Sequence, residues 1–351
     1  MESTAALLAW YDANRRPLPW RGDRSPYEIW VSEIMLQQTR VETVLPFYAR
    51  FLARFPTVSA LAAASEEEVL ALWSGLGYYR RARSLHAAAR QVEAAGGEVP
   101  SSAEELRRLP GVGPYTAAAI ASLAFGLPEP VLDGNVERVL SRYRRVGEPV
   151  RSAAGKRRLL GIARDLLDRD RPGDFNQALM ELGARVCTPR TPDCPSCPLA
   201  VDCEALSRDD VAAYPARTER RPPRKEARLL VVVRSRGKLL MSRRSADSER
   251  MPAMWELPWT DATTEPEEAL AQRYGGRWAV GPASGRVRHS ITSRSLEVAV
   301  HSATWLPSEV AENGSLRWID EGRLNDLPMS SLVGKALAEA SAPRSPGAPR
   351  R

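Results

Sequence analysis

The sequence predicts two domains, a mainly α-helical amino-terminal domain and a smaller α+β domain after it. With 351 residues, the chain exceeds the length at which one hydrophobic core usually stops growing. Apolar residues recur with helical spacing from residue 3 to about residue 206, and they alternate in strand-like runs after residue 229. We therefore expect a helical domain at 1–216 and an α+β domain at 229–340.

Each domain contains segments whose pattern predicts its elements. In the first domain Pro or Gly stands at most helix ends, and the helices are expected at residues 27–38, 66–73, 81–95, 103–109, 115–125 and 175–184. In the second domain turn-like tetrads interrupt the alternating runs at 229–244 and 286–305, which predicts strands joined by turns. Helices are expected there at 266–274 and 327–340.

The stretch 217–228, RTERRPPRKEAR, separates the two domains. It combines two prolines with six basic and two acidic residues, so it has no apolar face to bury. We expect an exposed basic linker. The last residues, 341–351, are rich in Pro, Gly and Arg, and this composition predicts a disordered tail.

The charge and the hydrophobic pattern of the sequence indicate which partners to expect and in which compartment the protein is found. A formal net charge of +7 favours a polyanion such as nucleic acid, although ribosome-associated and membrane-surface proteins share this balance. The longest aliphatic run, residues 229–233, is far too short to cross a bilayer, and residues 1–11 lack the pattern of a secretion signal. We expect a cytoplasmic protein, associated with the nucleoid, with no membrane partner.

All four cysteines lie in one short segment. Cys187, Cys194, Cys197 and Cys203 are separated by six, two and five residues, which is close enough to surround one centre. Four thiolates suit either a zinc ion or an iron-sulfur cluster. Zinc ribbons use paired CxxC knuckles, whereas this segment has a single one. The residues by themselves leave zinc, a cluster and inert thiols open.

The segment 109–125, LPGVGPYTAAAIASLAF, predicts a helix, a tight turn and a second helix. Gly111 and Gly113 permit a close backbone approach, and Pro114 suits the first helical position, where exposed amides form a phosphate site. An ordinary corner between two helices has the same form. Asp133 follows after a Gly- and Pro-rich passage, where it either caps the next helix or carries chemistry.

Together these motifs resemble the endonuclease III superfamily of DNA glycosylases, whose signature is a helix-hairpin-helix, a Gly/Pro passage and an aspartate. The resemblance implies a [4Fe-4S] cluster on the cysteines and DNA contacts at Gly111 and Gly113. It implies that Asp133 faces the sugar, where a carboxylate stabilises or traps an oxocarbenium-like ribose. Bifunctional members carry a lysine where this chain has Tyr115, which offers no amine for Schiff-base chemistry. We therefore expect a monofunctional enzyme.

The first domain extends the resemblance to one family. The chain is similar to MutY-type adenine DNA glycosylases over almost all of residues 1–210, in the segments RPLPWR (16–21), PYEIWVSEIMLQQTRVETVLPFY (26–48), WSGLGYYRRARSLHAAA (73–89) and FNQALMELGA (175–184). Adenine is a poor anionic leaving group and must be protonated as its bond breaks. The resemblance implies that Glu33 protonates adenine N7 and then helps to activate water. By pattern alone, Glu33 could simply be a solvated residue of an amphipathic helix.

The same resemblance implies which residues surround the base. Asn135 matches a position beside the sugar, and pocket positions are matched by Arg16, Trp20, Arg21, Leu36, Tyr115 and Glu181. Gln38 and Tyr78 match side chains that insert into the DNA and offset the stacking lost when a base is flipped. By pattern alone, Tyr115 and Asn135 could equally serve packing and capping. Tyr78 could likewise be a core aromatic residue.

The second domain resembles the Nudix-like domain of this family, which recognises 8-oxoguanine on the opposite strand. A Nudix hydrolase needs a Glu-rich helix for magnesium, and residues 256–276 do not reproduce it. We expect a binding module without hydrolase activity. Where the family usually has Phe-Ser-His, this chain has Ile291, Thr292 and Ser293, so a hydroxyl is kept and an imidazole is lost. The strength of the preference for 8-oxoguanine over guanine therefore stays open.

The resemblance as a whole implies a monomeric, monofunctional adenine DNA glycosylase of base excision repair, with duplex DNA carrying A:8-oxoguanine or A:G mispairs as its partner. Three alternatives are a glycosylase of the same fold for thymine or uracil, a DNA damage-binding protein without turnover, and a Nudix nucleotide hydrolase. The carboxyl pair Glu33 and Asp133 disfavours the second, and the missing magnesium helix disfavours the third.

Overall fold

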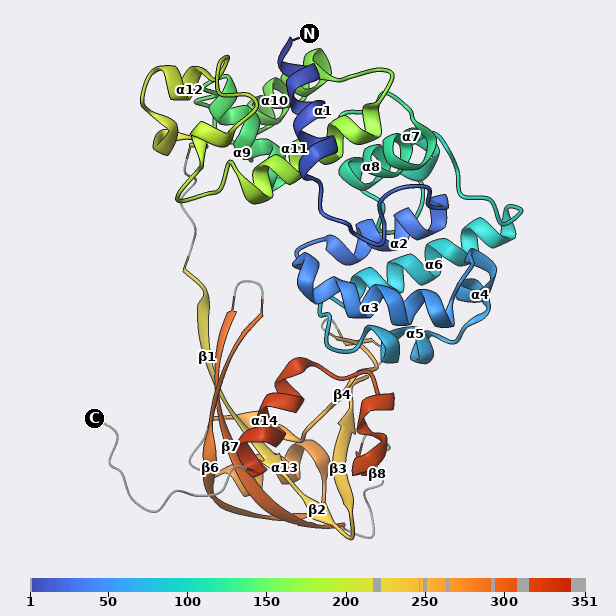
Figure 1. Ribbon diagram of the computed structural model, residues 1–351. Helices are drawn as coiled ribbons and strands as arrows, with labels where there is room; N and C mark the ends of the chain where they lie inside the picture. Colours follow the sequence, from blue (N-terminus) through green and yellow to red (C-terminus); the bar gives the residue numbers. More distant parts are fainter. Residues whose placement is uncertain are drawn as a thin grey trace. The chain divides into compact units, whose positions relative to one another are not determined.

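The computed structural model describes residues 2–216, 222–245, 247–248, 251–262, 265–291, 294–307 and 316–341. Contacts divide the chain into two compact units (Figure 1). The helical unit comprises Met1–Ala63 and Ser84–Arg220, and the mixed unit comprises Ala64–Arg83 and Arg221–Arg351. The first is built from helices and loops and the second from strands and helices, so the predicted fold class is confirmed. In the described residues, no helix is both long enough and apolar enough to span a bilayer.

The helical unit contains helices that follow one another through short loops. In chain order they are α1 (Glu2–Asn14), α2 (Pro26–Leu36), α3 (Val41–Arg54), α4 (Val58–Ala63), α6 (Arg80–Ala94), α7 (Ala103–Leu106), α8 (Pro114–Phe125), α9 (Gly134–Tyr143), α10 (Ala153–Leu166), α11 (Pro172–Arg185) and α12 (Glu204–Ser207). The first turn of α6 belongs to the mixed unit. One-turn 3-10 helices lie at Cys194–Ser196 and Val211–Ala213.

Local sequence sets the starts of the helices that carry the site. Ser25 caps α2 through a capping box with Glu28, and Pro26 occupies the first turn. Asp133 caps α9 by accepting hydrogen bonds from two backbone N–H groups. At its other end α2 stops at Leu36, two residues before the predicted end, because Gln38 turns the chain with a φ of 58°.

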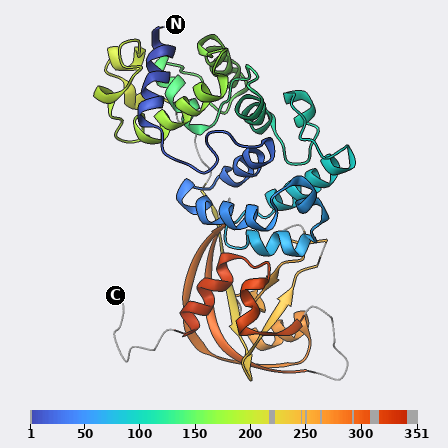
Figure 2. The ribbon, with the colours of Figure 1, turned by 45° about the vertical axis from the view of Figure 1, so that its right-hand side comes forward.

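A single core holds α9 against α1, α8, α10 and α11. The buried apolar side chains of α9 are Val136, Val139, Leu140 and Tyr143, which have the i, i+3, i+4, i+7 spacing of one helix face. They pack with buried side chains of α1, α10 and α11, and these helices lie together in both views (Figures 1 and 2). The core therefore fixes the amino terminus of α9, where Asp133 lies.

The mixed unit contains two β-sheets and flanking helices. The larger sheet has the strand order β5 (Trp259–Asp261), β1 (Arg224–Val232), β7 (Arg294–Leu306) and β6 (Arg277–Ile291). β1 and β7 are parallel, whereas the other neighbours are antiparallel. In the smaller sheet β3 (Lys238–Arg243) pairs with β2 (Arg234–Ser235), β4 (Trp255–Glu256) and β8 (Leu316–Asp320). The helices are α5 (Glu66–Trp73), α13 (Pro266–Tyr274), α14 (Ser331–Ser341) and a 3-10 helix at Glu321–Asp326.

The larger sheet carries one helix on each face. Leu230 of β1 packs in a core with Val333 of α14, whereas the adjacent Leu229 packs in a second core with Leu270 of α13. Neighbouring residues of a strand point to opposite faces. The continuous apolar run at 229–233 is therefore a strand buried on both faces.

The predicted linker at 217–228 is wrong at its carboxyl end. β1 begins at Arg224 and pairs with β7 residue by residue from there. Backbone pairing does not require apolar side chains, and Glu226 forms ion pairs with Arg228 and Arg294. Residues 217–221 and the predicted tail from 342 onward lie outside the described residues.

Two further boundaries differ from the prediction. The helix expected at 327–340 begins at Ser331, because Met329 forms a bridge with Trp255 instead. The segment Ala64–Arg83, expected in the helical domain, lies with the mixed unit. The hydroxyls of Ser74 and Tyr79 both donate to the carbonyl of Met329, about 250 residues away in the chain. A local sequence pattern gives no sign of contacts at that separation.

Candidate active site

A cleft of about 1700 Å³, including its open mouth, lies in the helical unit and is lined by α2, α8, α9, α11 and residues 16–21. All residues predicted for catalysis and the base pocket line this cleft, together with Gln38. They are Arg16, Trp20, Arg21, Glu33, Leu36, Gln38, Tyr115, Asp133, Asn135 and Glu181. The tertiary fold therefore brings residues from both ends of the helical unit into one site.

Glu33 is a buried carboxyl group in the middle of α2. Its side chain is only 5% exposed, which excludes a solvated position on the helix. The hydroxyl of Tyr115 donates to Oε2 of Glu33 at 3.0 Å. The pKa of Glu33 is raised to about 7, mainly by burial. The Tyr115 hydrogen bond lowers this pKa, and the nearby charge of Asp133 raises it, and both effects are included in that value. Glu33 can therefore hold a proton near neutral pH.

Asp133 has a different environment at the amino terminus of α9. Its Oδ1 accepts hydrogen bonds from the backbone N–H groups of Asn135 and Val136, at 3.0 and 2.7 Å. Its Oδ2 accepts one from the side-chain amide of Asn135 at 3.2 Å. Burial raises the pKa of Asp133 above its usual value, and these three bonds offset the effect of burial only in part. Three donors and the helix amino terminus favour the carboxylate form far more than the single donor at Glu33 does.

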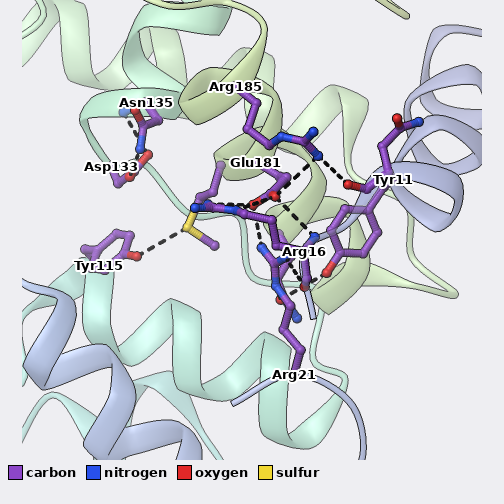
Figure 3. Close-up of polar contacts among 11 residues, drawn as sticks. Tyr11, Arg16, Arg21, Tyr115, Asp133, Asn135, Glu181 and Arg185 are labelled. Atoms are coloured by element: carbon purple, nitrogen blue, oxygen red, sulfur yellow. Dashed lines mark hydrogen bonds and ion pairs between the residues drawn. The ribbon is translucent and has the colours of Figure 1, made fainter. Parts of the chain in front are cut away.

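A second group of charged residues lies on the other side of the cleft (Figure 3). Glu181 of α11 is 1% exposed and accepts hydrogen bonds from Arg16 at 2.7 and 2.9 Å and from Arg21 at 2.8 Å. Burial raises the pKa of Glu181, but the two guanidinium groups outweigh it and lower the pKa to about 2. Arg21 also donates to Gln177 at 2.8 Å, which the sequence analysis missed. These hydrogen bonds hold the charged side chains of Arg16, Arg21 and Glu181 in fixed positions along the cleft.

A chain of hydrogen bonds joins Asp133 to the cysteine segment. Arg138 donates to Oδ1 of Asn135 at 2.9 Å, and Asn135 in turn donates to Asp133. The same guanidinium donates to the carbonyl groups of Cys187 at 2.7 Å and Gly183 at 2.6 Å. The sequence analysis did not single out Arg138. Its position three residues after Asn135, on the same helix face, is the signal that could have found it.

The four cysteines line one pocket of about 400 Å³, including its open mouth, between α9, α11 and α12. Three of the sulfur atoms have donors: Arg142 donates to Cys187 at 3.3 Å, and backbone N–H groups donate to Cys197 and Cys203. Such donors stabilise thiolates that bind metal. Burial nevertheless raises the pKa of Cys197 and Cys203, and the thiol of Cys203 donates to the carbonyl of Arg142. Among the described residues, no group of three or more His, Cys, Asp or Glu side chains is placed to hold a single metal ion.

Gly111, Gly113 and Tyr78 are not among the residues that line the cleft. Gly111 has a φ of 77° and lies so close to Ser84 that a Cβ would approach its Cβ to 2.5 Å, while Gly113 caps α8. Tyr78 belongs to the mixed unit and is 47% exposed, so it is not a core residue. Thr292 and Ser293 lie outside the described residues.

Comparison with known proteins decides the family. Residues 31–160 match the HhH-GPD superfamily base excision DNA repair protein family, and residues 228–339 match the NUDIX domain family. The adenine DNA glycosylase of Homo sapiens is 40% identical over 400 residues, covering 95% of this chain and 72% of the human protein. The adenine DNA glycosylase of Mus musculus is 40% identical over 397 residues, covering 94% and 76%. The chain belongs to the adenine DNA glycosylase family.

The resemblance found in the sequence is thereby confirmed, and the protein is an adenine DNA glycosylase of base excision repair. The solved structure of a thermostable thymine-DNA glycosylase is 31% identical with a TM-score of 0.54, and it covers 58% of this chain and 95% of that chain. This likeness extends over part of the chain, whereas the adenine DNA glycosylases match almost all of it.

The pH dependence of base excision should report the two carboxyl groups of the glycosylase. Because the pKa of Glu33 is raised to about 7, mainly by burial, its protonated form predominates below that pH and is lost above it. We expect the single-turnover rate to fall about tenfold per pH unit above neutrality, and to fall again at acid pH as Asp133 is protonated. A profile that stays flat from neutral to alkaline pH would contradict the assignment of Glu33 as the acid.

Gly183 should prove essential because a side chain there would displace Asn135. A Cβ at Gly183 would lie 2.6 Å from the Cβ of Asn135 and 3.1 Å from its backbone. We expect Gly183→Ala to lower the excision rate at least tenfold, because a misplacement of about 1 Å at a reacting group costs that much or more. The control is Gly161→Ala in α10, where a Cβ meets nothing within 4 Å. Equal rates for both variants would refute this role.

Proposed function

We propose that the glycosylase hydrolyses the N-glycosidic bond of adenine paired with 8-oxoguanine or guanine in duplex DNA. The observation that supports this most is the pairing of a buried, proton-holding Glu33 with the hydrogen-bonded Asp133 in one cleft. Two carboxyl groups with different proton affinities are the usual equipment for glycosidic cleavage. A flipped adenine fits such a cleft because it must leave the base stack before its sugar bond is accessible.

In the proposed first step, Glu33 transfers its proton to N7 of the flipped adenine. The electrons of the bond between C1′ and N9 then move onto the base, which departs as a neutral purine. Asp133 stays ionised and stabilises the positive charge that remains on the sugar, or traps it covalently. Water adds to C1′, and its proton passes to the Glu33 carboxylate, which restores the starting state.

Tyr115 and Asn135 are proposed to hold these two groups in place. Tyr115 donates to Glu33, so that the other carboxyl oxygen is free for adenine N7. Asn135 donates to Asp133 from its backbone and its side chain, and thereby supports the charged form. Trp20, Leu36 and the group formed by Arg16, Arg21 and Glu181 are proposed to line the base pocket.

The glycosylase is proposed to be monofunctional. Strand cleavage through a Schiff base requires an amine that attacks C1′. Tyr115 lies in the cleft at the position where bifunctional relatives carry a lysine, and it offers a hydroxyl that is already bonded to Glu33. The product is therefore expected to be an intact strand with an abasic site.

We propose that Cys187, Cys194, Cys197 and Cys203 hold a [4Fe-4S] cluster. The four thiols line a single cavity, and three of them receive hydrogen bonds that suit thiolate ligands. When bound, the cluster would stiffen the loop from Cys187 to Cys203 and add charge to it.

Excision kinetics on a set of duplexes test the proposed substrate. We expect single-turnover release of adenine from A:8-oxoguanine and A:G duplexes and slow release from A:C, with strands that stay intact until heated in alkali. Glu33→Gln, which cannot donate a proton, should lower the rate by about two to four orders of magnitude. The control is Glu104→Gln, because the Glu104 side chain is 77% exposed on α7 and does not line the cleft. Prompt strand cleavage would contradict a monofunctional enzyme.

Metal analysis tests the proposed cluster. The purified protein should contain iron and acid-labile sulfide in a ratio close to one, and should be brown. Cys197→Ser should lower the iron content and the thermal stability together, because metal binding contributes to folding. A colourless protein that contains zinc would refute the cluster.

A further inference from the structure

Tyr78 is presented on a turn that holds it in an unusual backbone conformation. Its φ is 51°, a left-handed value that is uncommon for a residue with a side chain, and its ring is 47% exposed. The residues on either side are anchored. The hydroxyl of Tyr79 accepts a hydrogen bond from the N–H of Gly75 and donates to the carbonyl of Met329. A strained, exposed aromatic residue on an anchored turn indicates a functional constraint.

Arg81 is the residue that connects this turn to the buried core. Its guanidinium carbon lies 5.5 Å from the ring centre of the fully buried Trp73 and 5.3 Å from the ring centre of Tyr78. It also donates to the carbonyl of Gly77 at 3.2 Å, and the indole of Trp73 donates to that same oxygen at 3.0 Å. Burial lowers the pKa of Arg81 to about 10, so it remains a cation at neutral pH.

These contacts constrain the Tyr78 ring through a group that is itself fixed. A planar guanidinium over two aromatic rings restricts the rotation of the exposed ring, whereas a solvated tyrosine would sample several rotamers. An aromatic side chain that inserts into a base stack loses less conformational entropy when it is already oriented. The same geometry would be poorly reproduced by lysine, which has no plane to stack.

We propose that Arg81 is a positioning residue, which orients Tyr78 for insertion into the DNA by stacking over its ring and binding the carbonyl of Gly77. This inference rests on the proposed flipping of adenine. It adds a residue that does not contact the base pocket and that acts only on the step in which the stack is opened.

The test compares two DNA substrates under single-turnover conditions. In the first, the adenine of an A:8-oxoguanine pair lies in a fully paired duplex. In the second, the same adenine lies in a bubble of mismatched bases, where little stacking is left to break. We expect Arg81→Met and Arg81→Lys to lower the rate on the paired duplex on the order of tenfold, and to change the rate on the bubble by no more than about twofold.

A double-mutant cycle with Tyr78→Ala shows whether Arg81 acts through Tyr78. If it does, adding Arg81→Met to Tyr78→Ala lowers the rate no further. Fluorescence of 2-aminopurine placed beside the mispair gives an independent readout of insertion, measured in the Glu33→Gln background to prevent cleavage. We expect Arg81→Met to reduce the fluorescence change on binding. Arg80→Met, which removes an exposed charge from the same helix, is the control and should leave the change intact.

The outcomes separate this inference from the proposed function. Equal losses on the paired and bubble substrates, or effects of Arg81→Met and Tyr78→Ala that add, would overturn the positioning role. An unchanged rate for Tyr78→Ala would overturn it as well, because insertion would then not depend on Tyr78. Failure of the proposed function would be seen separately, as a wild-type protein that releases no adenine from either substrate.

Discussion

The chemistry of this glycosylase depends on unequal hydrogen bonding to two buried carboxyl groups in one cleft. Two carboxyls that share a buried site disfavour simultaneous ionisation, so one of them tends to retain a proton. Asp133 has three donors at a helix amino terminus, whereas Glu33 has the hydroxyl of Tyr115. In the proposed mechanism, this difference places the proton on Glu33, which acts as the acid for the base, and the charge on Asp133, which stabilises the sugar cation.

The helix α9 connects this electrostatic difference to the rest of the helical unit. Its amino terminus supplies the N–H groups that bind Asp133, and its apolar face anchors it in the core. Through Arg138 it is also bonded to the backbone of Cys187. The cysteine segment and Asp133 are thus joined to the same helix by hydrogen bonds.

Charged side chains are buried in two different ways in this molecule: Glu181 is paired with opposite charges, and Arg81 lies over aromatic rings. In the cleft, Glu181 is kept ionised by two guanidinium groups that satisfy its buried oxygens, which makes it a fixed feature of the base pocket. In the mixed unit, the cation of Arg81 lies over the rings of Trp73 and Tyr78. We propose that the first arrangement contacts the base and that the second orients Tyr78.

The sequence by itself determined the fold class and offered Asp133 as a helix cap, because periodicity and capping are local properties. The residues that line the cleft were indicated by the resemblance to a family. Only the tertiary structure decided the roles of Arg138 and Arg81, the strand that begins at Arg224, and the placement of Ala64–Arg83. Hydrogen bonds, ring contacts and strand pairing between distant residues produce these features. The proton affinity of Glu33 belongs with them, since burial is a property of the folded chain.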